Sequence, residues 1–214
     1  MPTAAGKTEN GKPVVGILAL QGSVAEHERA LKRVGVNTVR VLKAEHLDGL
    51  DGIILPGGES TTIGKLLKLF DIFEPLKVKI ESGLPVFGTC AGLILLAKEI
   101  EGEQPHLAAM DIRVRRNAYG RQIDSFCSRA VIPEFSGAPL ELVFIRAPWI
   151  EKVFGKARVV AEIDGHIAAA RQDNMLVTSF HPELTSDITV HQYFTDMVKA
   201  RMKDMRGKDA ETEA

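Results

Sequence analysis

Cysteines are few in this sequence, long apolar runs are absent, and neither sign of charge predominates. Two cysteines among 214 residues cannot build a disulfide-stabilised scaffold and favour a reducing compartment. No stretch of about 18 consecutive apolar residues occurs, so a transmembrane helix is not expected. The 27 Lys and Arg residues against 28 Asp and Glu leave a formal net charge of −1, which provides no electrostatic footprint for nucleic acid or an anionic membrane. The sequence therefore predicts a cytoplasmic protein with neither kind of partner.

The length indicates a single domain, because domains usually hold roughly 100–200 residues. Residues 14–203 are predicted to form that domain. The polar residues 1–13 lack the apolar core of a signal peptide and are expected to be a flexible N-terminal extension. The charged residues 204–214 are expected to be a flexible C-terminal tail.

Short apolar runs alternate with longer amphipathic ones, which is typical of a parallel sheet flanked by helices. Ser23 and Glu26 match a capping box that opens a helix to about residue 34, and Gly35 matches its C-cap. The predicted fold class is α/β, with a three-layer, open, mostly parallel sheet flanked by helices and a strand-rich antiparallel extension in the second half. Strands are predicted at residues 14–20, 38–42, 52–55, 85–87, 158–163, 166–171 and 175–180. Further helices are predicted at 61–70, 93–98 and 188–205, with one more between the first two that ends at residue 80.

The sharpest local feature is Gly88-x-Cys90-x-Gly92, placed between a predicted strand and a predicted helix. A sharp strand-to-helix turn lifts its central side chain off the sheet, and the glycines remove Cβ clashes. The amides and positive dipole end of the following helix favour a thiolate, and the N–H of Ala91 would face an oxyanion formed at the sulfur. A small buried cysteine in a glycine-rich turn is the simpler interpretation. Cys127 lacks this frame, and we predict a packed, inert thiol there.

A catalytic thiolate needs a base and a group that orients the base. Only one of the six histidines, His181, lies just past a buried strand, in Ser179-Phe180-His181-Pro182-Glu183. In extended backbone, residues i and i+2 share a face, so Glu183 can hold the imidazole. A surface histidine beside a helix-capping Glu is the alternative. The other histidines are predicted to be structural or solvated: His27, His46, His106, His166 and His191.

Gly57 and Gly58 follow the third predicted strand, where a glycine N–H can serve as a second oxyanion donor. A plain turn with a helix cap at Ser60 or Thr61 is the alternative interpretation. The spacing and lysine of a phosphate-binding loop are missing, and no Cys/His metal-ligand spacing occurs. All three elements follow predicted parallel strands at their carboxyl ends, where open α/β sheets place their sites.

The sequence resembles the class I (triad) glutamine amidotransferases. The resemblance is strongest to the subfamily that serves vitamin B6 synthesis, the glutaminase subunits of pyridoxal 5′-phosphate synthase. Two stretches, RNAYGRQIDSF and FIRAP, are particular to that subfamily. The stretches that carry the resemblance are LALQGSVAEH (18–27), ILPGGESTT (54–62), FGTCAGLILLAKEI (87–100), RNAYGRQIDSF (116–126), FIRAP (144–148) and SFHPELT (179–185).

The resemblance implies a role for each residue of these motifs. Cys90 is the implied nucleophile, His181 the base and acid, and Glu183 the orienting group. The oxyanion hole is expected from Gly58 and Ala91. Glutamine contacts are implied for Gly58, Glu59, Ser60, Arg116, Ile145 and Arg146. A guanidinium suits the substrate carboxylate, and the residues leave open which arginine contacts it. Arg115 is expected to be a solvated neighbour.

The implied activity is hydrolysis of L-glutamine to glutamate and ammonia through a γ-glutamyl thioester, without a metal or organic cofactor. The implied partner is a (β/α)8-barrel synthase subunit that uses the ammonia to build pyridoxal 5′-phosphate, in a complex of twelve copies of each subunit. Residues 21–27 lie near the same sheet edge, and two interpretations stay open for them, a contact with that partner or the capping box.

Two other functions remain as alternatives. A cysteine peptidase or γ-glutamyl hydrolase of this fold would act without a partner. A binding or redox-sensing module would use a reactive Cys90 and ignore glutamine, which would leave the His-Pro-Glu element without a purpose.

Overall fold

The computed structural model describes residues 11–116 and 125–212. Its main sheet has ten strands, nine of them in the order β2-β1-β3-β4-β12-β11-β9-β6-β5, with β10 paired to β11. The five strands from β2 to β12 in this order run parallel to their neighbours, and β11 begins an antiparallel part. The parallel strands are β1 (Val14–Leu18), β2 (Asn37–Val41), β3 (Gly52–Leu55), β4 (Val86–Thr89) and β12 (Met175–Thr178).

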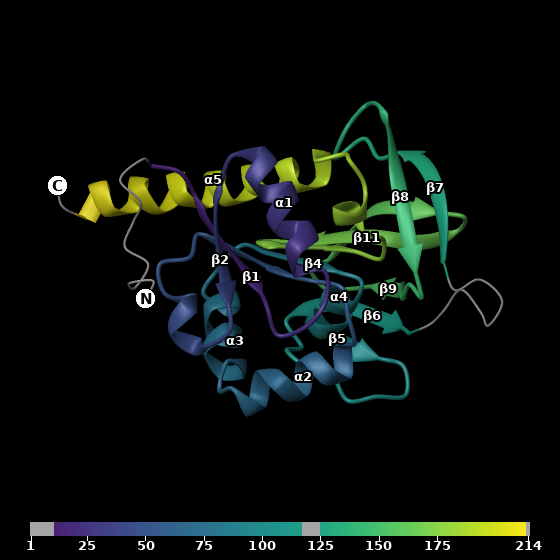
Figure 1. The fold of residues 1–214 in the computed structure, drawn as a ribbon, viewed down its shortest axis with the longest axis horizontal. Coiled ribbons are helices and arrows are strands. Elements are labelled where there is room, and N and C mark those ends of the chain that lie inside the picture. The colour runs from purple at the N-terminus through teal and green to yellow at the C-terminus, as the bar shows by residue number, and fades with distance from the viewer. Residues whose placement is uncertain (1–10, 117–124, 213–214) are drawn as a thin grey trace.

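The antiparallel part of the sheet extends from β12 to the far edge, where β5 and β6 form a further parallel pair. A separate two-stranded sheet, the β7–β8 hairpin, stands beside the main sheet (Figure 1). These observations confirm the predicted fold class. The strands concerned are β5 (Ala97–Ile100), β6 (Met110–Arg115), β7 (Ser125–Val131), β8 (Pro139–Ile145), β9 (Trp149–Val153), β10 (Arg158–Ile163) and β11 (His166–Gln172).

Helices cover both faces of the sheet, because alternate residues of the buried strands point to opposite sides. Ile53 and Leu55 of β3 belong to one apolar cluster with α2, α3 and α4, whereas Ile54 belongs to a second cluster with α1, α5 and β8. Figure 1 shows α1 and α5 together on one face and α2 and α3 on the other. The helices are α1 (Val24–Val34), α2 (Ser60–Leu69), α3 (Phe73–Glu81), α4 (Ala91–Leu96) and α5 (Thr189–Thr212), with 3-10 turns η1 (Ala44–Leu47) and η2 (Pro182–Leu184).

Several predicted boundaries are wrong. The helix predicted at residues 93–98 starts at Ala91 and ends at Leu96, and β5 begins directly after it because this segment pairs with β6. The strand predicted to reach residue 180 ends at Thr178. The last helix reaches Thr212, so residues 204–212 of the predicted tail are helical. The helix α1 ends as predicted, with Gly35 in the left-handed region at φ 86°.

In the part of the chain that the structure describes, no helix is both long enough and apolar enough to cross a membrane.

Candidate active site

Four neighbouring parallel strands, β1, β3, β4 and β12, deliver chain segments to one edge of the sheet. Cys90 follows β4 directly, and its N–H donates to the carbonyl oxygen of Thr178 at the end of β12 (2.8 Å). Gly57 follows β3, His181 follows β12, and the loop that ends in Ser23 follows β1. The carboxyl ends of parallel strands share one edge, so segments far apart in the sequence meet there.

Cys90 occupies a strained turn between β4 and α4. Its backbone has φ 48° and ψ −98°, a conformation that L-residues rarely adopt and that concentrates at functional sites. The two flanking glycines make the turn possible, because a Cβ on Gly88 would collide with the backbone of Gly92, and a Cβ on Gly92 with the carbonyl oxygen of Leu55. The side chain is largely buried, and its Sγ lies 3.9 Å from the carbonyl oxygen of Ile145 on β8.

His181 connects the thiol to Glu183. The ring faces the Cys90 thiol, whose interaction raises the pKa of His181, and its Nδ1 lies 2.8 Å from Oε1 of Glu183. We expected extended backbone between the two residues, but the chain turns into η2 at Pro182, and the contact is made across this turn. The N–H of His181 donates to the carbonyl oxygen of Val143 (2.8 Å), so β8 also fixes the backbone of His181.

The buried His181 and Glu183 form an ion pair. Burial alone would lower the pKa of His181, but hydrogen bonds to Cys90 and Glu183 and their charges raise it to about 10. Burial alone would raise the pKa of Glu183, but His27, His181 and Ser23 lower it to about 2. An imidazolium that faces a thiol favours the thiolate, so the arrangement can activate a sulfur nucleophile and later return the proton to a leaving group.

Ser23 contacts Glu183 and does not cap α1. Its Oγ donates to Oε1 of Glu183 at 2.6 Å, and no side-chain hydrogen bond caps the helix. Glu26, the other half of the predicted capping box, pairs with Arg29 at 2.9 Å. The capping-box interpretation is therefore wrong, because the buried carboxylate takes the hydroxyl that the motif assigns to the helix end.

The Gly57 turn is held from both sides. The N–H of Gly57 donates to Oγ1 of Thr89 (2.9 Å), and its carbonyl oxygen accepts the N–H of Ser23 (3.2 Å). The side chain of Gln21 accepts the N–H of Glu59 at 2.9 Å. A Cβ on Gly57 would collide with Cε1 of His181, so only glycine lets this turn approach the imidazole.

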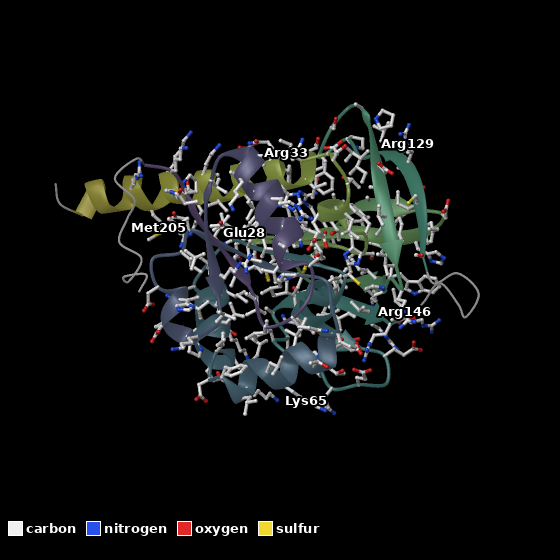
Figure 2. The ribbon with its side chains drawn as sticks, in the orientation of Figure 1. Glu28, Arg33, Lys65, Arg129, Arg146 and Met205 are labelled. Carbon is white, nitrogen blue, oxygen red and sulfur yellow. The ribbon has the colours of Figure 1, made fainter. Side chains whose placement is uncertain are left out.

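The residues implied as glutamine contacts lie around this edge, with different partners. Arg116 pairs with Glu103 and, at 2.9 Å, with Oε1 of Glu59. Ser60 is buried at the start of α2. Ile145 is the last residue of β8, and Arg146 follows it, at the end of the hairpin opposite Arg129 (Figure 2). Gly58 follows Gly57 in the same turn, and Ala91 is the first residue of α4.

A family model for the SNO glutamine amidotransferase family matches residues 17–200. The chain belongs to this family. It is 57% identical over 185 residues to the pyridoxal 5′-phosphate synthase subunit PdxT of Carboxydothermus hydrogenoformans, covering 86% of this chain and 97% of that protein. The PdxT of Desulforamulus reducens is 50% identical over 187 residues, covering 87% of this chain and all of that protein. A solved structure described as a glutamine amidotransferase superposes with a TM-score of 0.82 at 45% identity, covering 86% of this chain and 98% of that one.

Three residues of this glutamine amidotransferase site were missed in the sequence: Ser23, His27 and His191. The two histidines are fully buried, and Nδ1 of His27 lies 3.0 Å from Nε2 of His191. A signal for both was present, because His27 precedes Ala30 and Leu31 by three and four residues, and His191 precedes Phe194 by three. This spacing puts each ring on the apolar face of its helix.

One expectation for other residues is wrong, because Cys127 is exposed on β7 and not packed. Arg115 is partly exposed, and its guanidinium pairs with Glu101 (2.5 Å) and Glu151 (2.9 Å). Within residues 11–116 and 125–212, no group of three or more His, Cys, Asp and Glu side chains could hold a metal ion.

Proposed function

We propose that this chain hydrolyses the side-chain amide of L-glutamine and passes the ammonia to a synthase subunit that forms pyridoxal 5′-phosphate. The family and the names of the curated relatives support the reaction class and the pathway. The single observation that carries the chemistry is the His181 ring, which faces the Cys90 thiol on one side and has its Nδ1 2.8 Å from Oε1 of Glu183 on the other. This is the order of a nucleophile, a general base and an orienting acid.

The reaction begins when the Cys90 thiolate attacks the carboxamide carbon and forms a carbon–sulfur bond. The N–H groups of Gly58 and Ala91 stabilise the oxyanion of the tetrahedral intermediate, and losing such a donor costs about 10²–10³ in rate in measured cases. His181 gives its proton to the leaving nitrogen as the carbon–nitrogen bond breaks, which releases ammonia and leaves a γ-glutamyl thioester. His181 then accepts a proton from water, whose oxygen attacks the thioester carbon; the carbon–sulfur bond breaks, which releases glutamate and restores the Cys90 thiolate.

The substrate is held by the charged and polar groups around this sheet edge. In this proposal Glu59, Ser60, Arg116, Ile145 and Arg146 contact the glutamine, together with Gly58. The ion pair of Glu59 with Arg116 offers opposite charges to the two charged groups of the amino acid. When glutamine binds, its ammonium and carboxylate groups would replace the contact between Glu59 and Arg116 with contacts of their own.

The ammonia requires a protected path, because in bulk water it becomes ammonium and loses its nucleophilicity. We propose a (β/α)8-barrel synthase as the partner, assembled with this chain as twelve copies of each, and a cytoplasmic location. Both cysteines are free thiols, which suits a reducing compartment.

The test measures glutamate and ammonia release from glutamine, with and without the cognate synthase subunit. We expect the wild-type protein to be active with the subunit and Cys90→Ala to be inactive. Cys127→Ser is the matched control, since it replaces the other free cysteine at an exposed position, and it should keep wild-type activity.

Each alternative function has its own outcome in this assay. Hydrolysis of γ-glutamyl peptides by the isolated chain would identify a γ-glutamyl hydrolase instead. Wild-type rates in Cys90→Ala would remove Cys90 from the mechanism. Ready oxidation of Cys90 with no turnover of glutamine under any condition would indicate a redox-sensing module.

A further inference from the structure

A pair of buried histidines lies behind the catalytic ion pair, and the mechanism above gives it no part. His27 comes from α1 and His191 from α5, two helices that share one face of the sheet (Figure 1). Both side chains are fully buried, and their rings also contact Phe87 of β4 edge-on. Buried histidines need partners for their ring nitrogens, and those partners define what the pair does.

The Nε2 atom of His27 faces two groups of the site. It lies 3.5 Å from Oε1 of Glu183, the oxygen that also contacts His181, and 3.2 Å from Oγ1 of Thr89. Thr89 in turn accepts the N–H of Gly57. Nε2 of His27 therefore lies beside both Glu183, which orients His181, and Thr89, which holds the Gly57 turn.

The groups around His27 determine which of its two ring nitrogens carries the proton. Burial, the largest cause, lowers the pKa of His27, and burial also lowers the pKa of His191 to about 3, so both rings are neutral at pH 7. A neutral imidazole carries one N–H and one acceptor nitrogen. The ionised Glu183 lies beside Nε2, which favours the proton on that nitrogen. Nδ1 of His27 is then the acceptor, and it receives the N–H of Nε2 of His191.

We infer that His27 is a positioning residue, which uses its Nε2–H to hold Glu183 and Thr89 in place while His191 fixes its tautomer. The order of contacts runs from His191 through His27 and Glu183 to His181 and Cys90. A neutral donor suits this place, because a second imidazolium beside Glu183 would compete with His181 for the same oxygen. The inference rests on the proposed glutaminase function.

Two amide substitutions separate the two nitrogens of His27. The side-chain nitrogen of Gln can occupy the position of Nε2, whereas the shorter Asn reaches only the position of Nδ1. In the complex with the synthase subunit, we expect His27→Asn to lower kcat by about 10- to 100-fold, the range for a small misplacement of a catalytic group, with little change in KM for glutamine. His27→Gln should recover most of the lost kcat.

A second readout needs neither glutamine nor the partner. In a Cys127→Ser background, Cys90 is the remaining cysteine, and its alkylation by iodoacetamide can be followed against pH. We expect His27→Asn to move the midpoint of this curve to higher pH, because a loosely held His181 stabilises the thiolate less. His191→Leu, which leaves Nδ1 of His27 without its donor, should move the midpoint in the same direction and test the inference if His27→Asn fails to fold.

The outcomes are distinct for the inference and for the proposed function. A pure packing role predicts that His27→Asn and His27→Gln lower the melting temperature alike and leave the alkylation midpoint unchanged, and this result would overturn the inference. Equal kcat losses in the Asn and Gln variants would do the same. If the wild-type complex releases no ammonia from glutamine, the proposed function fails, whereas a shifted midpoint would still support the positioning role.

Discussion

At the residue scale, a single oxygen atom organises the candidate site. Oε1 of Glu183 receives the hydroxyl of Ser23 and Nδ1 of His181, with Nε2 of His27 close by. These donors come from the loops that follow two different strands, β1 and β12, and from the interior of a helix. Hydrogen bonds to a buried carboxylate are stronger than those between neutral groups, so each donor that is removed should have a measurable effect.

Ser23→Ala tests whether the hydroxyl serves Glu183 or the end of α1. We expect a loss of about 1.5–3 kcal/mol in the free energy of unfolding, the range for a hydrogen bond to a charged group. A double-mutant cycle with Glu183→Gln decides between the two roles, because residues in contact show coupling and a helix cap would not depend on Glu183. Additive effects in urea denaturation would return Ser23 to the capping role, and Ser23→Thr, which keeps the hydroxyl, is the control.

Gly57→Ala should abolish the activity without unfolding the protein. The new methyl group would collide with the His181 ring, so the ring or the Gly57 turn must move away from Cys90. We expect at least a 100-fold fall in kcat/KM, the scale of a misplacement of about 1 Å. Gly137→Ala is the matched control, since a Cβ there meets nothing within 4 Å, and it should behave as the wild type. A fully active Gly57→Ala would show that the turn plays no part in placing the imidazole.

At the element scale, the sequence predicts the parallel half of the sheet much better than the rest. Strands such as β1 and β3 are short apolar runs buried on both faces, and this composition identifies them without knowledge of their partners. By contrast, β7 alternates between exposed and half-buried residues, and the connection to its partner β8, residues 132–138, lacks a two-residue turn signal such as the Asp164-Gly165 between β10 and β11. The catalytic candidates follow apolar strands and were found for that reason. The buried histidines lie inside helices, where the residue type alone does not reveal burial and only the spacing from apolar neighbours indicates it.

The β7–β8 hairpin reaches the site through β8 and is anchored through Glu134 in its turn. The carbonyl oxygens of Val143 and Ile145 contact His181 and Cys90. Glu134 pairs with Arg158 of β10 and accepts the hydroxyl of Tyr193 of α5. The hydrogen bond from Arg158, together with Tyr193 and nearby charge, outweighs the opposing effect of burial and lowers the pKa of Glu134 to about 2. The anchor is therefore charged at any physiological pH.

Glu134→Ala should loosen the hairpin and weaken catalysis from a distance. We expect faster amide exchange in β7 and β8, with unchanged exchange in β1 and β3, and a lower kcat for glutamine in the complex with the synthase subunit. Glu141→Ala removes an exposed carboxylate from the same hairpin and serves as the control. Unchanged exchange across β8 in Glu134→Ala, measured by mass spectrometry, would show that the hairpin does not depend on this anchor.

At the scale of the whole molecule, the buried titratable groups of the site make the free energy of unfolding depend on pH. The pKa of His27 and that of His191 are lowered by burial, the latter to about 3, so below pH 6.5 the unfolded chain binds more protons and stability falls as the pH falls. Glu183, whose pKa is lowered to about 2, adds a further loss of stability that begins below pH 4.5 and continues as the pH falls toward 2. His181 has the opposite sign, because its pKa is raised to about 10, and its contribution is complete below pH 6.5 and disappears as the pH rises toward 10.

These signs predict greatest stability near pH 6.5 and a measurable loss already at pH 5. His191, whose pKa is lowered to about 3, costs up to about 1.4 kcal/mol per pH unit below its unfolded pKa, or about 2 kcal/mol between pH 6.5 and 5. His191→Gln removes this cost and keeps a donor for His27, so its loss over this interval should be smaller than that of the wild type by up to about 2 kcal/mol. Urea denaturation at pH 6.5 and 5 measures both losses. Equal losses in the two proteins would mean that His191 takes up its proton in the folded state, and that the helix face it occupies is open to water at pH 5.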